Sequence, residues 1–451
     1  MVYFKWNSEG NLMDEGLIND EYINLIISNQ EKYNQDYHNT MDKVRNSKAK
    51  YKGEPIPTIY HPMFITDNNI DDFNKIGGTM ISITNKITDK YIEDKEFRRK
   101  FAFPQLVEDL IEVDNGYDIH VPIGRFDLFY KNYENFMFCE LNTDGSSAMN
   151  EDNVLSKIML ESKVLRDFSS KYKLDFFELF DTWVDESIKI YKKYDPSNKN
   201  PNIAIVDFVE SGTSNEFEEF KQRYINKGYN CIIADPRDLE YRDGKLYHQN
   251  YRIDLVYRRI VTFELINKAD QIPDFIKAYK DRAFCCIGSI RSQVIHNKIF
   301  FKILHDKDTL EYLNEEEEEF VRKHIPYTGI FGGSRHVFDN VLSNKDKYIM
   351  KPMDLNASQG VYTGRDMSQR EWEKRLEESW DNDYLYQEYF DPFTRDFLLF
   401  EEDKFEVESF GIITGLYMYN EKLAGVYSRI GQKSIIAGVT DYYTLPNIFI
   451  E

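Results

Sequence analysis

Four polar residues between positions 125 and 142 form the pattern best suited to chemistry. Arg125 and Asp127 are separated by one phenylalanine, and, after an apolar segment, Glu140 and Asn142 are separated by one leucine. The two carboxylates and the amide oxygen are hard oxygen ligands of the kind that Mg²⁺ takes, leaving its other positions to water and phosphate. An arginine beside them suits a phosphate oxygen. The pattern therefore indicates a site for a metal ion and a phosphate.

Both halves of this pattern lie in strand-like sequence. Because side chains alternate across a strand, Arg125 and Asp127 share one face, and Glu140 and Asn142 also share one face. If the two strands pair, the four side chains converge on one patch. The alternative is a solvated hairpin in which the arginine and the aspartate only pair with each other, since half-exposed strands alternate in the same way.

A lysine at the end of an apolar strand is a second feature suited to phosphate. Residues 347–352 predict a strand that contains Lys351, and a turn of small polar residues follows over 356–360, ending in Gly360. Small residues let backbone N–H groups approach phosphate oxygens, and a lysine beside them adds a point charge. The G-x-x-x-x-G-K-[ST] order of a P-loop is absent. Taken alone, a lysine at this position can also be structural.

Four further residues fit a nucleotide but are individually weak signals. Gln387 and Glu388 end a strand that is predicted over 384–388, where they could contact the edge of a purine in an apolar slot. Lys298 begins a helix-like segment, and Arg429 lies in a strand near the C-terminus. Each of these two could contact an anion or lie on the surface.

The elements that must position these residues change in type along the chain. The first hundred residues carry apolar side chains at helical spacing and are expected to pack as a helical cap. Strands are predicted over 118–142, followed by helices over 150–168 and 176–194. A polar linker over 196–201 leads to short buried strands that alternate with helices from residue 202, the pattern of an open α/β sheet.

Size and charge limit the class of protein. With 451 residues, the chain is long enough for two or three lobes. Its 57 Lys and Arg against 78 Asp and Glu give a net charge of −21, which argues against nucleic-acid binding because the phosphate backbone would be repelled.

No apolar run is long enough to span a bilayer, so no membrane association and a cytoplasmic location are expected. The four cysteines form no C-x-x-C pair and predict neither a zinc site nor disulfides.

Taken in order, these residues resemble the ATP-grasp ligases, and more closely the synthetase domain of glutathionylspermidine synthase. Residues 125–142 match that family's arginine, aspartate, glutamate and asparagine motif with near-identical spacing. The resemblance implies a catalytic role for Arg125 and Mg²⁺ binding by Asp127, Glu140 and Asn142. The residues that it assigns to ATP are Lys298, Lys351, Gly360, Gln387, Glu388 and Arg429.

The resemblance also implies a fold. It is an α/β (α+β) ATP-grasp fold with a permuted motif order, because the metal motif precedes the lysines, and with the nucleotide held between two lobes. The implied division is a helical N-terminal cap (1–110), the metal-motif part of the ATP-grasp core (111–200), a preATP-grasp-like open α/β sheet (201–295) and the lysine lobe with the C-terminal core segment (296–451). The phosphate loop departs from the family, because residues 355–359 contain no glycine.

The function implied is an ATP- and Mg²⁺-dependent ligase that joins a small-molecule carboxylate, such as a peptide or amino acid, to an amine such as a polyamine through an acyl phosphate. Two alternatives are a nucleotide-binding regulatory or scaffold protein without catalysis, and a kinase that phosphorylates a small molecule. The substrate pocket is expected between the cap and the loops at 144–150, 209–214 and 257–259. The sequence identifies neither the acid and the amine nor the oligomeric state.

Overall fold

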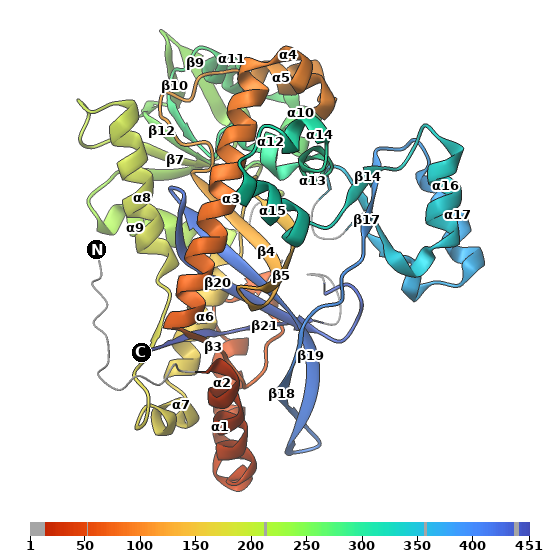
Figure 1. Cartoon of the computed structure of the whole chain (residues 1–451). Coiled ribbons are helices and arrows are strands. Elements are labelled where there is room, and N and C mark those ends of the chain that lie inside the picture. Colours follow the sequence, from red (N-terminus) through yellow and green to blue (C-terminus); the bar gives the residue numbers. More distant parts are fainter. Residues whose placement is uncertain (1–13, 52, 212–213, 356–358, 437–441) are drawn as a thin grey trace.

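The chain is built around one large antiparallel sheet (Figure 1). The computed structural model describes residues 14–51, 53–211, 214–355, 359–436 and 442–451. Strands follow the order β21-β20-β19-β4-β5, and β18 also pairs with β19. The sheet joins two distant parts of the chain, with the strands β4 (Ile123–Asn132), β5 (Asn135–Asn142), β18 (Thr394–Glu401), β19 (Lys404–Tyr419), β20 (Lys422–Gly431) and β21 (Tyr442–Leu445).

The predicted pairing of the two polar strands is confirmed. β4 and β5 form an antiparallel hairpin in which Arg125 lies opposite Asn142 and Asp127 lies opposite Glu140. On its other side, β4 pairs with β19, so it is an inner strand of the sheet. Asp127 is only 1% exposed. The hairpin is therefore part of the core, and the alternative of a solvated hairpin is wrong.

A second sheet contains four parallel strands in the order β13-β12-β7-β8. It confirms the open α/β sheet that the sequence predicts from residue 202. Its two faces follow the strand alternation: Ile203 and Ile205 pack in the core of α8 and α9, whereas Ala204 and Val206 pack in the core of α10 and α11. Its elements are β7 (Ile203–Val206), α9 (Ser214–Asn226), β8 (Cys231–Ala234), β12 (Leu255–Arg258), α10 (Thr262–Asn267), α11 (Pro273–Lys280) and β13 (Cys285–Ile287), with α8 (Leu179–Tyr194) preceding them.

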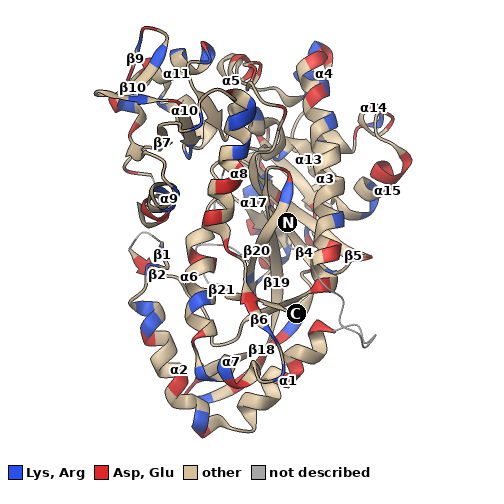
Figure 2. Ribbon diagram, turned by 90° about the vertical axis from the view of Figure 1, so that its left-hand side faces the viewer, with Lys and Arg blue, Asp and Glu red and all other residues tan. Residues whose placement is uncertain are grey.

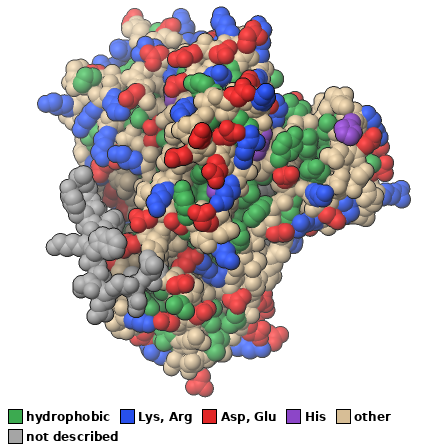
Figure 3. Space-filling model, in the orientation of Figure 1, with side chains coloured by type: hydrophobic (Ala, Val, Ile, Leu, Met, Phe, Trp, Pro, Cys, Tyr) green, Lys and Arg blue, Asp and Glu red, His purple; other side chains and the backbone are tan. Residues whose placement is uncertain are grey.

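A smaller lobe projects from the body and carries α16 and α17 (Figure 1). Its antiparallel sheet has the order β14-β17-β15-β16, and it has a hydrophobic core of its own around Trp372 and Met350. Hydrophobic side chains also gather on the surface where the lobe meets the body (Figure 3). Its elements are β14 (Thr328–Ile330), α16 (Arg335–Ser343), β15 (Tyr348–Pro352), β16 (Tyr362–Thr363), α17 (Gln369–Ser379) and β17 (Tyr384–Glu388).

The N-terminal segment that we expected to be a helical cap is divided between two places. α1 (Glu15–Ile27) and α2 (Gln30–Arg45) lie at the end of the molecule near the β18–β19 hairpin, as Figure 1 shows. The long α3 (Asp67–Glu93) instead packs on the main sheet against β4, β19 and β20. The helix approaches closely because Gly77 has no side chain: a Cβ there would lie 2.9 Å from the methyl group of Met418.

Another sheet, of three strands, ties the C-terminal strand to two earlier segments of the chain. The strand β22 (Asn447–Ile450) pairs in parallel with β3 (Met63–Thr66) and antiparallel with β6 (Leu174–Phe176). The other elements are the strands β1 (Lys50–Tyr51), β2 (Glu54–Pro55), β9 (Leu239–Arg242), β10 (Lys245–His248) and β11 (Tyr251–Ile253), and the helices α4 (Lys95–Arg98), α5 (Gln105–Ile111), α6 (Met149–Leu160), α7 (Lys163–Phe168), α12 (Gln293–His296), α13 (Ile299–Leu304), α14 (Lys307–Leu310) and α15 (Glu315–His324).

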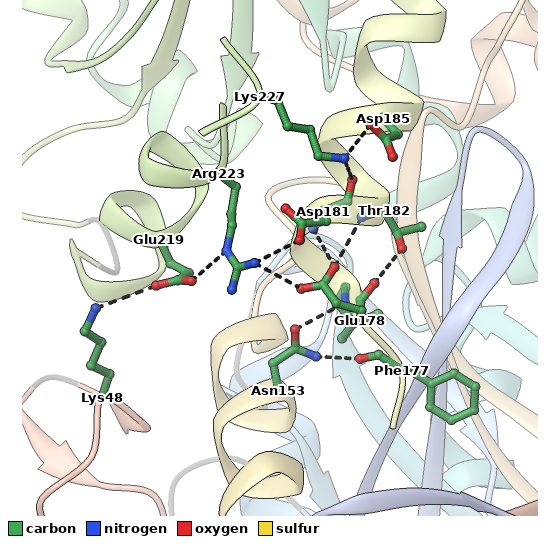
Figure 4. Close-up of polar contacts among 11 residues, drawn as sticks. Lys48, Asn153, Phe177, Glu178, Asp181, Thr182, Asp185, Glu219, Arg223 and Lys227 are labelled. Atoms are coloured by element: carbon green, nitrogen blue, oxygen red, sulfur yellow. Dashed lines mark hydrogen bonds and ion pairs between the residues drawn. The ribbon is translucent and has the colours of Figure 1, made fainter. Parts of the chain in front are cut away.

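Charged residues of both signs are interspersed along the outer helices, although the net charge is strongly negative (Figure 2). One network of such residues fixes the corner where α6, α8 and α9 meet (Figure 4). Arg223 on α9 bonds to Asp181 on α8 over 2.9 Å and to Glu219 over 2.9 Å.

Among the described residues, no helix has the length and apolar character needed to cross a membrane.

Candidate functional site

The buried carboxylate of Asp127 is the centre of the candidate site. Arg125 makes a two-pronged contact with it, Nε to Oδ1 over 2.7 Å and Nη2 to Oδ2 over 2.9 Å. Arg429, on β20, donates from Nη2 to the same Oδ2 over 2.8 Å. Two arginines that are 304 positions apart in the chain thus share one carboxylate, because the strands β4, β19 and β20 lie side by side.

The positive charge of Arg125 is firmly held, and both arginines lie against one aromatic ring. Burial opposes the charge on Arg125, but the adjacent Asp127 outweighs burial and raises the pKa of the guanidinium well above its ordinary value. The guanidinium carbons of Arg125 and Arg429 lie 5.0 and 5.6 Å from the ring centre of Tyr427. Nε of Arg429 is buried and has no hydrogen-bond partner among the described residues. That N–H is available to an anion.

Glu140 and Asn142 complete the group on β5. Nδ2 of Asn142 donates to Asp127 over 3.2 Å and to Glu140 over 3.1 Å, so its amide oxygen points to neither carboxylate. Burial opposes the charge on Glu140, but the positive charges of Lys298 and Lys351 outweigh it and lower the pKa of Glu140 to about 2. Glu140 is therefore a carboxylate anion at neutral pH.

The two lysines predicted to contact phosphate both lie beside Glu140. Nζ of Lys298, which immediately precedes α13, is 3.8 Å from Glu140 Oε2 and donates to the carbonyl of Leu355 over 2.9 Å. Nζ of Lys351, on β15, donates to the carbonyl of Cys139 over 3.0 Å. Burial lowers the pKa of Lys351, and the charge of Lys298 lowers it further. The structure thus brings Lys351 of the smaller lobe and Lys298 beside α13 to the polar hairpin of the main sheet.

A cavity that is partly open to solvent lies over these residues. Its mixture of an apolar wall with a few charged groups is typical of a small-molecule site. Its charged lining residues are Asp127, Glu140, Lys298, Lys351, Glu388 and Arg429. Its apolar lining includes Phe129, Met137, Ile349, Leu355, Val361 and Ile413.

The predicted adenine contacts occupy one wall of this cavity. Gln387 is buried, and its amide donates to Thr328 on β14 over 2.9 Å. Glu388 is exposed, and its backbone N–H donates to the carbonyl of Tyr327 over 2.9 Å. Both residues line the cavity together with Tyr389 and Phe390. An aromatic and amide wall of this kind suits a planar base.

Gly360 does not line the cavity, as is also the case for Arg125 and Asn142. Its φ is +70°, and a Cβ there would lie 2.7 Å from the hydroxyl of Tyr384, so a glycine is required for the turn itself. Residues 356–358 of the predicted phosphate loop lie outside the described residues. How this loop approaches a phosphate stays a prediction.

The donor set fits a nucleotide more fully than it fits a metal ion. Mg²⁺ needs only one or two protein carboxylates when phosphates and water supply the rest. Glu140 and the amide oxygen of Asn142 meet that requirement, whereas both oxygens of Asp127 already accept hydrogen bonds from arginines. Within the described part of the chain, no three His, Cys, Asp or Glu side chains form a metal cluster. Asp127 could bind a cation only by giving up an arginine contact.

Two of the loops expected to line the substrate pocket contact each other, but their two arginines already form ion pairs with other residues of the chain. Arg258 contacts Asp144 over 2.6 Å, and Arg259 contacts Glu216 over 2.9 Å and also the carbonyl of Ser146. Both arginines are almost fully buried. They therefore hold the loops 144–150 and 257–259 together. Part of the third loop, residues 212–213, lies outside the described residues.

Two residues of the site were missed in the sequence. Gly415 lies opposite Asp127 on one side and Tyr427 on the other, and a Cβ there would lie 2.7 Å from Asp127 Oδ1 and 2.8 Å from Arg125 Cδ. Tyr427 provides the ring beneath both guanidiniums. Tyr427 is two positions before Arg429 and so shares its strand face, which was the one available signal.

Comparison with solved structures finds a similar fold. A glutathione synthetase-like effector from Globodera pallida superposes with a TM-score of 0.55 over 92% of this chain and 97% of that chain, at 10% sequence identity. D-alanyl-alanine synthetase A from Vibrio cholerae matches with a TM-score of 0.28 over 55% of this chain and 89% of that chain, at 12% identity, which is too low to support an argument.

The sequence comparisons are negative: no family model matches the chain, and no curated protein matches it. The resemblance to glutathionylspermidine synthases, including the permuted order of the motifs, therefore stays a prediction. At 10% identity, the structural similarity to the effector concerns the fold alone. The chain has a mixed α/β fold, similar over nearly its whole length to that of a glutathione synthetase-like effector.

Proposed function

We propose that the protein is an ATP- and Mg²⁺-dependent ligase that joins a small carboxylate to an amine through an acyl phosphate, as in glutathionylspermidine synthases. One observation carries the proposal: Lys298, Lys351 and Arg429 converge with Glu140 and Asp127 on a single cavity, and Arg125 pairs with Asp127 beside it. A polyphosphate needs several fixed cations, and phosphoryl transfer depends mostly on positioning and charge.

Each charged residue then has a distinct task. Lys298 and Lys351 bind the phosphate chain and balance its charge. Arg125 and Arg429, held by Asp127, would supply positive charge to the transferring phosphoryl group and to the oxygen that becomes negative when the acyl carbon is attacked. Glu140 and Asn142 would hold Mg²⁺, which when bound neutralises charge on the phosphate oxygens. Gln387 and the apolar wall hold the base.

The test is a panel of carboxylates and amines incubated with Mg-ATP, followed by measurement of ADP and phosphate. Glutathione and free amino acids serve as acids, and spermidine, putrescine and amino acids serve as amines. We expect ADP release that requires both partners, and an amide in the product by mass spectrometry. If ATP binds while no combination gives turnover, the ligase proposal fails. A phosphorylated product without an amide would indicate a kinase.

A matched pair of lysine variants links the activity to the cavity. Lys351→Met removes a cation that lines the cavity, whereas Lys347→Met removes an exposed lysine four residues earlier. Loss of one preorganised charge is expected to lower turnover by about 100-fold or more. The Lys347 variant should keep wild-type activity.

One observation favours a second candidate, a nucleotide-binding regulatory or scaffold protein without catalysis. Both oxygens of Asp127 are occupied by arginines, which leaves Mg²⁺ fewer ligands than the family motif implies. Such a protein would bind ATP, and Mg²⁺ would change its affinity little. A ligase should instead require Mg²⁺ for turnover.

A further inference from the structure

A row of side chains crosses the sheet of the smaller lobe on the face that looks onto the cavity. Thr328 on β14 lies opposite Gln387 on β17, which in turn lies opposite Ile349 on β15. Residues directly opposite each other in an antiparallel sheet project from the same face. Gln387 and Ile349 both line the cavity, whereas Met350, on the other face, packs in the core of the lobe. Thr328 is therefore the neighbour of Gln387 on the side away from Ile349.

The hydroxyl of Thr328 determines which way the amide of Gln387 is turned. It donates to the carbonyl of Pro326 over 3.0 Å. Because a hydroxyl carries a single proton, Thr328 can act toward Gln387 only as an acceptor. The amide must then turn its NH₂ group to Thr328, in agreement with the 2.9 Å contact from Nε2 to Oγ1. Thr328 and Gln387 are only 2% and 5% exposed, so water does not compete for this hydrogen bond.

The oxygen of the same amide is left for a ligand. Among the described residues, no donor reaches Oε1 of Gln387. Lys298 and Lys351, which line the same cavity, donate instead to the backbone carbonyls of Leu355 and Cys139. Gln387 lines both the main cavity and a smaller one beside it. An acceptor of fixed direction is thus presented to the base that occupies the cavity.

We propose that Thr328 determines the base specificity of the nucleotide site, because it fixes the Gln387 oxygen as an acceptor for the 6-position of a purine. This inference rests on the proposed function and adds how its nucleotide is selected. The 6-amino group of adenine donates to such an oxygen. The 6-oxygen of hypoxanthine or guanine would instead meet it acceptor to acceptor, and both oxygens would lose their hydrogen bonds. Thr328 acts through Gln387 and is a positioning residue.

The test measures binding of two nucleotides to the full chain by calorimetric titration in the presence of Mg²⁺, without an acid or an amine. Inosine triphosphate is the probe, because it has the ribose and the triphosphate of ATP and differs from it in the 6-oxygen and the proton on N1. We expect the wild type to bind ATP about 10-fold more tightly than inosine triphosphate, or better. No turnover is needed for this measurement.

Thr328→Val keeps the size of the side chain and removes its hydroxyl. The amide of Gln387 can then turn over and present its NH₂ group to a 6-oxygen. We expect the preference for ATP to fall to about threefold or less, chiefly because inosine triphosphate binds more tightly. Thr328→Ser retains a hydroxyl and should keep the wild-type preference.

Thr363→Val is the matched control, because it makes the same substitution in the same row of the sheet. Thr363 on β16 lies opposite Ile349 on the side away from Gln387, and it is also buried. Its hydroxyl oxygen accepts from the backbone N–H of Arg365 over 3.2 Å. Any loss of stability from a missing hydroxyl should appear in this variant too, whereas the preference for ATP should stay at the wild-type value.

A double variant tests whether Thr328 acts through Gln387. Gln387→Leu removes the amide and should abolish most of the preference for ATP, and adding Thr328→Val should then change the preference no further. Equal binding of both nucleotides by the wild type, an unchanged preference in Thr328→Val, or a further change in the double variant would overturn the inference and leave the ligase proposal intact. A wild type that binds neither nucleotide would overturn the nucleotide site and the ligase proposal together.

Discussion

Gly415 lies directly opposite Asp127 across the β4–β19 ladder, and a Cβ at this position would lie 2.7 Å from Asp127 Oδ1. Real Cβ atoms do not approach other heavy atoms this closely. The missing side chain is therefore what lets the Arg125–Asp127 ion pair lie flat on the sheet. This glycine is as much a part of the candidate site as the charged residues.

The first prediction is that Gly415→Ala disturbs the site without unfolding the sheet. The new methyl group must displace Asp127 or Arg125, so nucleotide-dependent turnover should fall by about 10-fold or more. Gly78→Ala is the control, because this exposed glycine lies within α3 with nothing within 4 Å of a Cβ, and alanine should stabilise a helix there by about 0.5–1 kcal/mol. Unchanged turnover in the Gly415 variant would show that the ion pair is not needed in its present position.

The second prediction concerns Asp127→Asn. The change leaves the buried arginines Arg125 and Arg429 without a counter-charge, and breaking a buried pair costs about 3–5 kcal/mol. We expect a lower melting temperature even without Mg²⁺, together with turnover reduced by orders of magnitude. Glu140→Gln should behave differently, raising the Mg²⁺ concentration needed for turnover with a smaller loss of stability, because Glu140 is 34% exposed. If Asp127→Asn altered only the Mg²⁺ requirement, Asp127 would be chiefly a metal ligand.

The third prediction is a pH effect on ATP affinity. Burial and the charge of Lys298 lower the pKa of Lys351, so this lysine loses its proton at a lower pH than an ordinary lysine. Only the protonated form attracts phosphate, and ATP affinity should therefore fall as the pH rises toward that lowered pKa. Lys351→Arg keeps its charge throughout this range, so calorimetric titrations should show a flatter profile for the variant. Parallel profiles for the two proteins would rule out Lys351 as the titrating group.

The sequence predicts the polar hairpin well because the signal is local. The alternation over residues 125–127 and 140–142 and the intervening turn are enough to place four side chains on one face. The parallel sheet from residue 202 is equally predictable from the sequence, since each of its buried strands is a short apolar run. These features depend on neighbours in the chain.

Other features depend on contacts between distant segments and leave little local trace. The sharing of Asp127 by Arg429 requires β19 to lie between β4 and β20, which no periodicity indicates. The close approach at Gly415 is visible only after the sheet has assembled. The splitting of the N-terminal helices follows from β3 pairing with the last strand of the chain.

The last prediction concerns Asp152, a fully buried carboxyl group on α6. Burial raises its pKa to about 7, well above the ordinary value of 3.8, because only the hydrogen bonds from Asn447 and Ser156 oppose burial. The folded state thus binds this proton more tightly than the unfolded state, so its contribution to stability is present below pH 4 and is lost as the pH rises to 7. Asp152→Asn keeps the acceptor for the Asn447 amide, which lies 2.7 Å away, and removes the charge. We therefore expect the variant to melt several degrees higher than wild type at pH 8 and to lose this advantage by pH 4.5, measured by thermal unfolding in matched buffers. A constant difference between the two proteins at both pH values would contradict the raised pKa.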